Sequence, residues 1–526
     1  MGGLALAPIN AIPAFVISAV ALVWLIDGGL ESKPGGAASL LRDIRVAALI
    51  GWWFGFGYFL AGLWWLGAAF LVEADQFAWA MPFGIIGLPA LLAAFPSVGC
   101  VVARILWSGG CGRVFALATG LGLSEWLRAV ALTGFPWNDI GMVLGGNLVL
   151  GQVTSVVGLH GLTFLTVAIA SAPATIFDPQ RPNHSGAAIS IRRYRSTGIA
   201  LFGVVLLALF GAIRLGVNPT EYVEKVRLRI VQPNLPQGEK FKPENGPDIL
   251  ATHIRLSDRS TSPQTAGIST VTHLFWPESP FPFLLSKNSQ ALAQIGKFLP
   301  PGTVLVTGAA RADRVGQDSA SKRRVTRYYN SIHIIDDKGV IRQTYDKSKL
   351  VPFGEYLPMA PLLQALGLKQ FVHVPGGFTA GSSAKTLDLP GIGMASPLIC
   401  YEAIFPGLTT ARTKSGIKPR VLVNVTNDGW FGLTTGPYQH LVQARLRSIE
   451  EGLPMIRVAN TGISAVIDPM GRILYSLPLG VQGVIDGQLP NRARQTIFSK
   501  YGLTVPALIA LLFLVLAMVF RFRARA

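Results

Sequence analysis

Two long apolar regions enclose a middle part whose hydrophobic pattern is different. A helix of about 20 mostly apolar residues is needed to cross a bilayer. Several runs near both ends meet this length, and one of them also carries Glu125 and Arg128. We predict membrane helices at about 9–26, 46–72, 77–103, 114–133, 155–177, 197–214 and 502–520.

The middle part, from Val226 to about Asn491, alternates short β-rich runs with polar or helical stretches. Strands that alternate with helices predict an α/β fold in which the strands lie between helical layers. No glycine-rich phosphate-binding motif follows a strand, which argues against a nucleotide cofactor. The predicted organisation is a membrane bundle over 1–215 with about six helices, a water-side domain over 216–501, and a last membrane helix with a basic tail over 502–526.

Basic residues are unevenly distributed among the predicted loops. Loops rich in Lys and Arg stay on the cytoplasmic side of a membrane. The loops that hold Glu73, Asp75 and Asp139 contain no Lys or Arg, so we expect them to face outward, together with the domain 216–501. The expected cytoplasmic basic residues are Lys33, Arg42, Arg45, Arg104, Arg113, Arg181, Arg192, Arg193, Arg195, Arg521, Arg523 and Arg525.

Composition agrees with a membrane protein. Half of the residues are hydrophobic and only 14% are charged, with a net charge of +18. Because much of the basic excess lies beside apolar segments, membrane orientation accounts for it better than nucleic-acid binding does. The three cysteines form no metal-binding pattern and allow no disulfide framework, so we expect no metal and no cofactor.

Two polar features fall within the apolar regions. Glu125 and Arg128 are three residues apart and can pair on one helix face, either as an interior ion pair or as a contact to a lipid head group. His160 is interpreted as a packed residue between helices.

Three polar positions of the middle part stand at the ends of predicted strands. Glu278 ends THLFWPES, Lys347 or Lys349 follows SIHIIDDKGVIRQTYD, and Cys400 ends GMASPLIC. Side chains at strand ends converge on a site in layered α/β domains. A cysteine thiolate forms a reactive thioester, Glu278 can move its proton, and a lysine with the Tyr401 N–H can stabilise an oxyanion.

Each of these residues can also have a purely structural role without any catalytic function. A cysteine at the end of an apolar strand is commonly a small buried residue. The WPES segment can be a turn, and either lysine can be solvated.

The runs WPES, RYYNS, YDKSKLVPFGEYLP, ICYE and NDGWFG with GPYQH resemble the nitrilase superfamily and its Glu–Lys–Cys triad. Together with GFPW at Gly134–Trp137 and the flanking helices, they resemble the apolipoprotein N-acyltransferase family over nearly the whole chain. The resemblance implies an α-β-β-α sandwich joined to a polytopic helical membrane bundle. It also implies a bacterial inner-membrane enzyme whose catalytic domain is periplasmic.

The implied reaction moves a fatty acyl chain from a membrane phospholipid, through a cysteine thioester, to the α-amino group of a diacylglyceryl-cysteine apolipoprotein. The implied triad is Glu278, Lys347 and Cys400, because the family's lysine stands five residues before the proline of VPFGE, here Pro352. The implied supporting residues are Glu355, Tyr401, Glu402 and Asn330.

The chain departs from the family pattern in two places. Phe241 occupies a position where the family often has tryptophan, which keeps an aromatic wall but loses an indole N–H. The family has eight membrane helices and seven are predicted here. Because LALAPINAIPAF resembles sequence that follows a helix, we expect that a start codon assigned too late removed the first one.

Two stretches of the water-side domain are unusually apolar, 280–285 and 362–372. Exposing each CH₂ of a lipid to water costs about 0.8 kcal/mol, so a lipid donor requires an apolar path. These stretches either guide the acyl chain at the membrane surface or pack in an ordinary core. The predicted substrate-binding residues are Phe241, Leu363, Leu366 and Phe371.

Two other functions compete with acyl transfer. A membrane-tethered amidase would use the same triad with water as the acceptor. A transporter or lipid-binding scaffold would have no catalytic role for Cys400. The amidase alternative needs neither the seven membrane helices nor the apolar stretches.

Overall fold

The computed structural model describes residues 1–29, 37–178, 186–262, 267–317, 324–365, 370–372, 374–381, 385–409 and 418–524. The chain forms two compact units. The first contains Met1–Pro219, Thr434–Glu450 and Gln495–Ala526, and the second contains Thr220–Leu433 and Glu451–Arg494.

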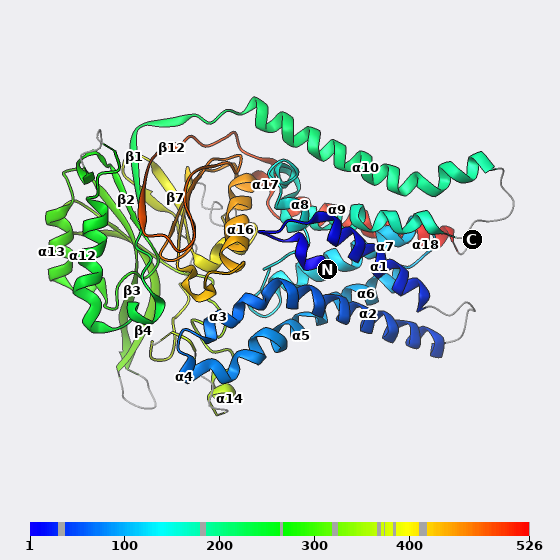
Figure 1. The fold of residues 1–526 in the computed structure, drawn as a ribbon, viewed down its shortest axis with the longest axis horizontal. Helices are drawn as coiled ribbons and strands as arrows, with labels where there is room; N and C mark the ends of the chain where they lie inside the picture. The colour runs from blue at the N-terminus through cyan, green and yellow to red at the C-terminus, as the bar shows by residue number, and fades with distance from the viewer. Residues whose placement is uncertain are drawn as a thin grey trace. The chain divides into compact units, whose positions relative to one another are not determined.

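The first unit is helical (Figure 1). Five of its described helical stretches are long and apolar enough to cross a membrane, at Ser39–Phe70, Phe83–Leu106, Leu150–Phe177, Tyr194–Val217 and Thr504–Arg523. The helices of this unit are α1 (Ile12–Gly28), α2 (Ala37–Leu63), α3 (Gly67–Phe70), α4 (Ala74–Phe77), α5 (Leu88–Leu92), α6 (Ala94–Leu106), α7 (Gly112–Val130), α8 (Met142–Gly145), α9 (Thr154–Ser171), α10 (Gly186–Val217), α17 (Ile497–Tyr501) and α18 (Thr504–Arg523), joined by α16 (Gly436–Glu451).

Small residues allow the apolar helices to pack closely. A Cβ atom at Gly120 of α7 would collide with the main-chain carbonyl of Gly99 on α6. Association inside a bilayer relies on such close backbone packing, because lipid tails are as apolar as the side chains that face them. The glycines therefore position α6 against α7.

Glu125 and Arg128 form an interior ion pair, which is the structural one of the two predicted alternatives. Both side chains are buried, and Arg128 Nε lies 3.2 Å from Glu125 Oε1. Arg128 also donates to the carbonyl oxygen of Trp137 at 2.8 Å, and its guanidinium lies 4.9 Å from the Phe59 ring centroid. The pair thus holds the GFPW segment in place.

His160 is a packed residue, as predicted. Its ring stacks on Trp126 with centroids 5.5 Å apart, and its Nδ1 lies 3.3 Å from Asp139 Oδ2.

Helix α16 is anchored to other parts of the first unit at both ends. Near its start, Gln439 Oε1 accepts hydrogen bonds from the indole nitrogens of Trp65 at 3.1 Å and Trp137 at 3.0 Å. Near its end, the carboxylate of Glu450 accepts from the Leu159 N–H at 2.8 Å, immediately after the backbone of α9 breaks at Gly158. The Glu450 side chain therefore satisfies a buried main-chain donor at the break in α9.

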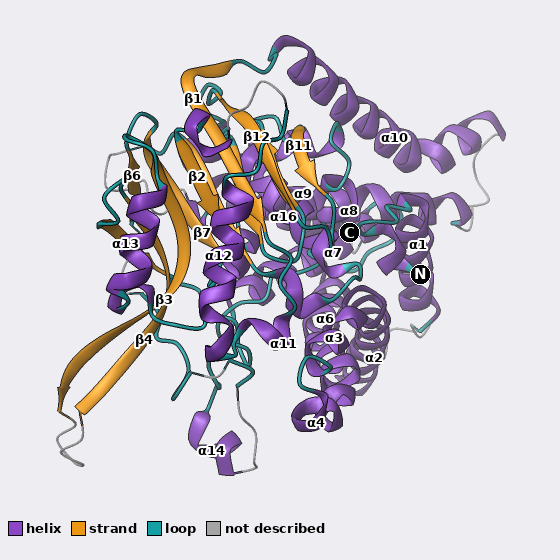
Figure 2. Ribbon diagram, turned by 60° about the vertical axis from the view of Figure 1, so that its left-hand side comes forward, coloured by secondary structure: helices purple, strands orange, loops and turns teal. Residues whose placement is uncertain are grey.

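The second unit contains two six-stranded sheets (Figure 2). Their strand orders are β12-β1-β2-β3-β4-β5 and β11-β10-β9-β8-β7-β6. The strands are β1 (Tyr222–Gln232), β2 (His273–Trp276), β3 (Val304–Gln317), β4 (Arg324–Ile335), β5 (Ile341–Asp346), β6 (Leu387–Leu389), β7 (Gly393–Ile399), β8 (Val421–Thr426), β9 (Met455–Ala459), β10 (Ser464–Ile467), β11 (Ile473–Leu477) and β12 (Gly483–Pro490).

Two apolar cores explain this layering. One core joins the two sheets, with Ile230 and Ile334 from the first sheet and Val423 from the second. The other lies between the first sheet and the helices α12 (Gly246–Ser257) and α13 (Ser289–Phe298). Inner strands such as β8 are buried along their whole length, as expected for parallel strands covered on both faces. The predicted α/β class is confirmed.

Short helices of the second unit include α11 (Gln237–Lys240), α14 (Ala360–Ala365) and the 3₁₀ turn η10 (Cys400–Ile404). The predicted domain boundaries and membrane orientation stay predictions. Of the basic residues used for orientation, Lys33, Arg181 and Arg525 and the side chains of Arg192 and Arg193 lie outside the described residues.

Candidate active site

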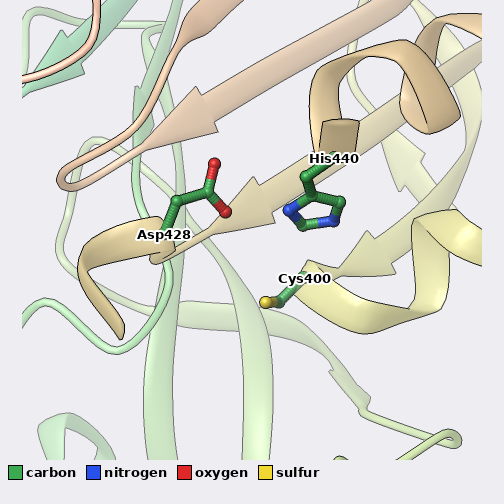
Figure 3. A group of neighbouring side chains, drawn as sticks. All are labelled: Cys400, Asp428 and His440. Atoms are coloured by element: carbon green, nitrogen blue, oxygen red, sulfur yellow. The ribbon is translucent and has the colours of Figure 1, made fainter. Parts of the chain in front are cut away.

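Cys400 stands at the sharp turn from strand β7 into η10 (Figure 3). Its φ angle is 49°, in the left-handed region that non-glycine residues rarely adopt. The Glu402 side chain accepts a hydrogen bond from the Ile399 N–H at 2.9 Å, which stabilises this turn. Tyr401, the next residue, is buried and packs edge-on against Phe405 with centroids 5.1 Å apart. The turn therefore holds the thiol at the end of its strand in a strained conformation.

Glu278 follows strand β2 and is buried. Its carboxylate accepts a hydrogen bond from Asn330 Nδ2 at 2.7 Å. The backbone at this position runs against Gly308 of strand β3, whose N–H donates to the Pro277 carbonyl at 3.1 Å. A Cβ atom at Gly308 would lie 2.6 Å from the Glu278 Cα, so glycine is what permits this approach.

Lys347 follows strand β5, with 1% of its side chain exposed. Its ammonium lies 2.9 Å from Glu355 Oε2 and 3.6 Å from Glu278 Oε1. Asn330 joins the two carboxylates, because the same amide nitrogen also donates to Glu355 Oε1 at 2.8 Å. The Lys347 N–H donates to the Asn330 carbonyl at 2.8 Å. One lysine, one amide and two carboxylates thus form a single buried cluster.

Glu402 connects this cluster to the cysteine turn. Its carboxylate accepts hydrogen bonds from the Tyr345 hydroxyl at 2.6 Å and from the Ser348 N–H at 2.8 Å. The Ser348 residue is the neighbour of Lys347, so Glu402 fixes the lysine loop and the turn at Cys400 together. Glu402 is fully buried, which makes these hydrogen bonds important for the shape of the site.

The structure shows which of the two candidate lysines lies near the thiol. Lys349 Nζ lies over the Phe405 ring, 5.3 Å from its centroid. Lys347, in contrast, interacts electrostatically with Cys400 as well as with Glu278 and Glu355. Lys347 is therefore the lysine that shares a pocket with the thiol.

Burial dominates the proton affinities of this pocket. Burial raises the pKa of the Cys400 thiol well above its usual value, and Glu278 raises it further, while Lys347 opposes both. Burial also raises the pKa of Glu278, an effect that Lys347 and Asn330 counteract. For Lys347 burial acts to lower the pKa, but Glu355 and Glu278 outweigh it and raise the pKa far above its ordinary range. The resting cysteine is therefore a neutral thiol beside a charged lysine.

Strand β8 supplies further neighbours of the thiol. It runs parallel to β7 with Ile399 opposite Val425, which brings Cys400 beside Thr426. A hydrogen bond with Thr426 acts to lower the pKa of Cys400. Thr426 also donates to Asp428 at 2.9 Å, and Asp428 is paired with the buried Arg457 at 2.7 Å. Figure 3 shows the Cys400 and Asp428 side chains on the turns that follow β7 and β8.

Two of the four predicted substrate-binding residues meet at an aromatic cluster. Phe241 stacks on Trp430 with centroids 6.4 Å apart, and Phe371 lies against the same indole at 6.2 Å. All three rings are partly exposed. Leu363 is partly exposed on α14, and Leu366 lies outside the described residues.

The first apolar stretch, 280–285, packs in the core. Phe281 and Leu285 are buried among residues of α12, α13 and the first sheet. The core-packing alternative therefore applies to this stretch, while the second stretch contains the strongly exposed Leu362.

Three residues of the site were not predicted from the sequence. Lys240 is buried, and its ammonium donates to the Glu278 carbonyl at 3.1 Å. Thr426 and Trp430 belong to the segment around NDGWFG, so that motif signalled their region but not their roles. A lysine in the polar run LPQGEKFKPEN carries no comparable signal.

A buried thiol, carboxylate and ammonium at the strand ends of a two-sheet α/β unit define an enzyme of the nitrilase type. The carbon-nitrogen hydrolase family matches residues 302–498, and the N-terminal domain of apolipoprotein N-acyltransferase matches residues 1–172.

Curated relatives extend over almost the whole chain. Apolipoprotein N-acyltransferase of Rhodopseudomonas palustris is 48% identical, covering 97% of this chain and 92% of the relative. That of Bradyrhizobium diazoefficiens is 48% identical over 98% of this chain and 92% of the relative. The chain belongs to the apolipoprotein N-acyltransferase family, and it is a membrane protein.

One solved structure with a similar α/β unit is an amidase variant from Nesterenkonia sp. AN1. It is 17% identical, covers 52% of this chain and 93% of the amidase, and gives a TM-score of 0.35.

Replacing Gly308 with Ala is expected to displace Glu278 from the cluster. The new methyl group would meet only backbone atoms of 277–279, at 2.6 to 2.7 Å, so a side chain cannot simply rotate away. We expect a loss of about 1–3 kcal/mol in the free energy of unfolding, together with slower acyl-enzyme formation. Thermal unfolding and a single-turnover assay measure the two effects. Gly483→Ala is the matched control, because its methyl group would meet only the flexible Leu477 side chain. Equal behaviour of the two variants would contradict the prediction.

Proposed function

We propose that this enzyme transfers a fatty acyl chain from a membrane phospholipid, through a thioester at Cys400, to the N-terminal α-amino group of a diacylglyceryl-cysteine apolipoprotein. The observation that carries the proposal is the buried cluster of Lys347, Glu278 and Glu355, whose charges act on the Cys400 thiol. A family of acyltransferases supplies the reaction class.

In the first half-reaction, Cys400 Sγ attacks the carbonyl carbon of a phospholipid ester. The Glu278 carboxylate accepts the thiol proton as the carbon–sulfur bond forms. The negative charge of the tetrahedral intermediate lies on the former carbonyl oxygen, where Lys347 and the Tyr401 N–H are the proposed donors. Cleavage of the ester carbon–oxygen bond releases the lysophospholipid, whose alkoxide takes the proton back from Glu278. The product on the enzyme is an acyl thioester.

In the second half-reaction, the amine of the lipoprotein attacks the thioester carbon. Glu278 accepts a proton from the attacking nitrogen, and the carbon–sulfur bond breaks. The proton then returns to the leaving sulfur, which restores the neutral thiol that burial favours. The amide product leaves with its acyl chain.

The supporting residues have positional roles in this proposal. Asn330 and Glu355 hold Glu278 and Lys347 at their observed separation. Glu402 fixes the lysine loop relative to the cysteine turn. Changing any of these should alter the geometry of the pocket without removing a reacting atom.

We further propose that the water-side unit lies on the periplasmic side of the bacterial inner membrane. Basic residues near helix ends, Arg42 and Arg45 in the first turns of α2 and Arg104 in the last turn of α6, support this orientation. A phospholipid donor also requires a site that the outer leaflet can reach, because exposing its acyl chain to water costs about 0.8 kcal/mol per CH₂.

Mass spectrometry tests the thioester directly. After exposure to a defined phospholipid, the peptide that contains Cys400 should gain the mass of one acyl chain, and Cys400→Ala should gain none. The adduct should persist in buffer and disappear when a diacylglyceryl peptide with a free α-amino group is added. Discharge by water alone would instead indicate an amidase-like hydrolase. Absence of any adduct on the wild-type protein would reject the proposed function.

Removing the aromatic cluster should slow acylation of Cys400. We expect the double variant Phe371→Ser, Trp430→Ser to form the acyl-enzyme about tenfold more slowly, corresponding to about 1.4 kcal/mol of lost contact with the acyl chain. Leu363→Ser tests the neighbouring helix in the same assay. Val340→Ser, an exposed apolar position on the turn before β5, is the control. An unchanged rate with normal thermal unfolding would remove these rings from the acyl-chain path.

Cysteine labelling in intact cells tests the orientation. In a Cys111→Ser background, Lys338→Cys places a thiol on an exposed turn of the second unit, and Arg523→Cys places one at the end of α18. A membrane-impermeant maleimide, admitted through the outer membrane, should label position 338 and reach position 523 only after the inner membrane is opened. The reverse pattern would place the catalytic unit in the cytoplasm.

A further inference from the structure

Lys240 is a buried lysine beside the reacting groups that the proposed mechanism does not use. It ends the short helix α11 and is 1% exposed. Its ammonium donates to the main-chain carbonyl of Glu278 at 3.1 Å and lies 5.5 Å from the centroid of the Phe241 ring. It interacts electrostatically with both Glu278 and Cys400. A charged amine is costly to bury, so its position here calls for a reason.

The positive charge of Lys347 is already compensated by two neighbouring carboxylates. Glu355 lies at 2.9 Å and Glu278 at 3.6 Å from its ammonium. Lys240 differs, because the oxygen that accepts its hydrogen bond is a neutral carbonyl. Its positive charge is therefore less closely compensated than that of Lys347.

A count of charge shows what this second ammonium contributes to the pocket. Before reaction, Lys347 and Lys240 carry two positive charges, Glu278 and Glu355 carry two negative charges, and the Cys400 thiol is neutral. When Glu278 has taken the thiol proton, the new negative charge resides on the tetrahedral acyl group, and the pocket is still neutral. Without Lys240 the pocket would carry one uncompensated negative charge both before the reaction and in the intermediate, which a desolvated site disfavours. In the intermediate this negative charge has moved to the acyl group at Cys400, a residue with which Lys240 interacts electrostatically.

We propose that Lys240 is a further positioning residue of acyl transfer, whose ammonium fixes the Glu278 backbone and balances the negative charge that forms on the acyl group at Cys400. This inference rests on the proposed thioester function. It assigns to the segment before Phe241 an electrostatic role in addition to the aromatic wall.

The surroundings of Lys240 define its expected pH response. Burial lowers the pKa of Lys240 to about 8, although Glu278 and Cys400 act in the opposite direction. His253, on the packed helix α12, has its pKa lowered to about 4 by burial and remains neutral above that pH. Glu239 and Asp248 line a cavity of about 150 Å³ together with Lys240, and hydrogen bonds from Lys242 and Asn245 lower the pKa of Glu239. Because these neighbours keep one charge state at neutral and mildly alkaline pH, a change near pH 8 is assigned to Lys240.

The test compares single-turnover acylation of Cys400 in Lys240→Met, Lys240→Gln and Lys240→Arg, from pH 6 to pH 10, with purified full-length protein in phospholipid-containing micelles. The wild-type rate should fall as pH rises through about 8, because the ammonium loses its charge. Lys240→Met and Lys240→Gln should each be slower on the order of 100-fold at pH 7, and neither should show the fall near pH 8. Lys240→Arg keeps its charge and should lose the fall near pH 8 while retaining a faster rate than the other two.

Lys242→Met is the matched control, since Lys242 is half-exposed and pairs with Glu239 at 2.7 Å. Thermal unfolding reports whether each variant is folded. Wild-type rate in Lys240→Met would overturn the inference, and full rescue by Lys240→Gln would reduce the role of Lys240 to its hydrogen bond. A slow Lys240→Met that keeps the wild-type fall near pH 8 would also overturn it. Failure of the wild-type protein to form any acyl-Cys400 would reject the thioester chemistry itself, which is a different result.

Discussion

The site depends on the ion cluster in which Lys347 lies between Glu278 and Glu355. Removing three charged groups from water is unfavourable, so such a cluster is stable only when each charge has close partners and the remaining polar atoms are hydrogen-bonded. Asn330 meets this requirement by donating to both carboxylates. Because the members come from the ends of β2 and β5 and from the loop that holds Glu355, the cluster also joins segments that are distant in sequence.

The two sheets give this cluster a rigid support. Strands β2 and β3 are parallel, and Gly308 lets the Glu278 backbone approach β3 closely. On the second sheet, the parallel pairing of β7 with β8 sets Cys400 beside Thr426. The apolar core between the sheets leaves little room for either edge to shift, so the polar groups meet in one fixed arrangement.

The sequence was sufficient for the class of fold and for the three principal polar residues. Glu278 and Cys400 each follow a clear apolar run, whereas Lys347 follows the mixed run IRQTYD. Resemblance to a known family distinguished Lys347 from Lys349. Lys240 was not predictable, because its burial depends on how α11 folds back after β1, and local sequence contains no signal for that.

Contacts between residues that are far apart in the sequence were also not predictable. Gln439 bonds to the indoles of Trp65 and Trp137, which precede it by 374 and 302 residues. Periodicity describes which face of one helix is apolar, and it does not identify a partner on another. For the stretch 280–285 the apolar composition fitted both a membrane-surface loop and a core segment, and only the observed burial of Phe281 and Leu285 decides between them.

The burial that raises the pKa of the Cys400 thiol also explains how this chemistry suits a lipid donor. A thiol that ionises only as Glu278 takes its proton stays unreactive toward solutes until an ester carbonyl occupies the pocket. The same burial raises the pKa of Glu278, which makes the protonated acid available for the leaving alkoxide. In the proposed mechanism, the burial of these groups limits the access of water to the thioester until an amine arrives. Desolvation therefore serves, in this mechanism, both the activation of the donor and the choice of an amine as the acceptor.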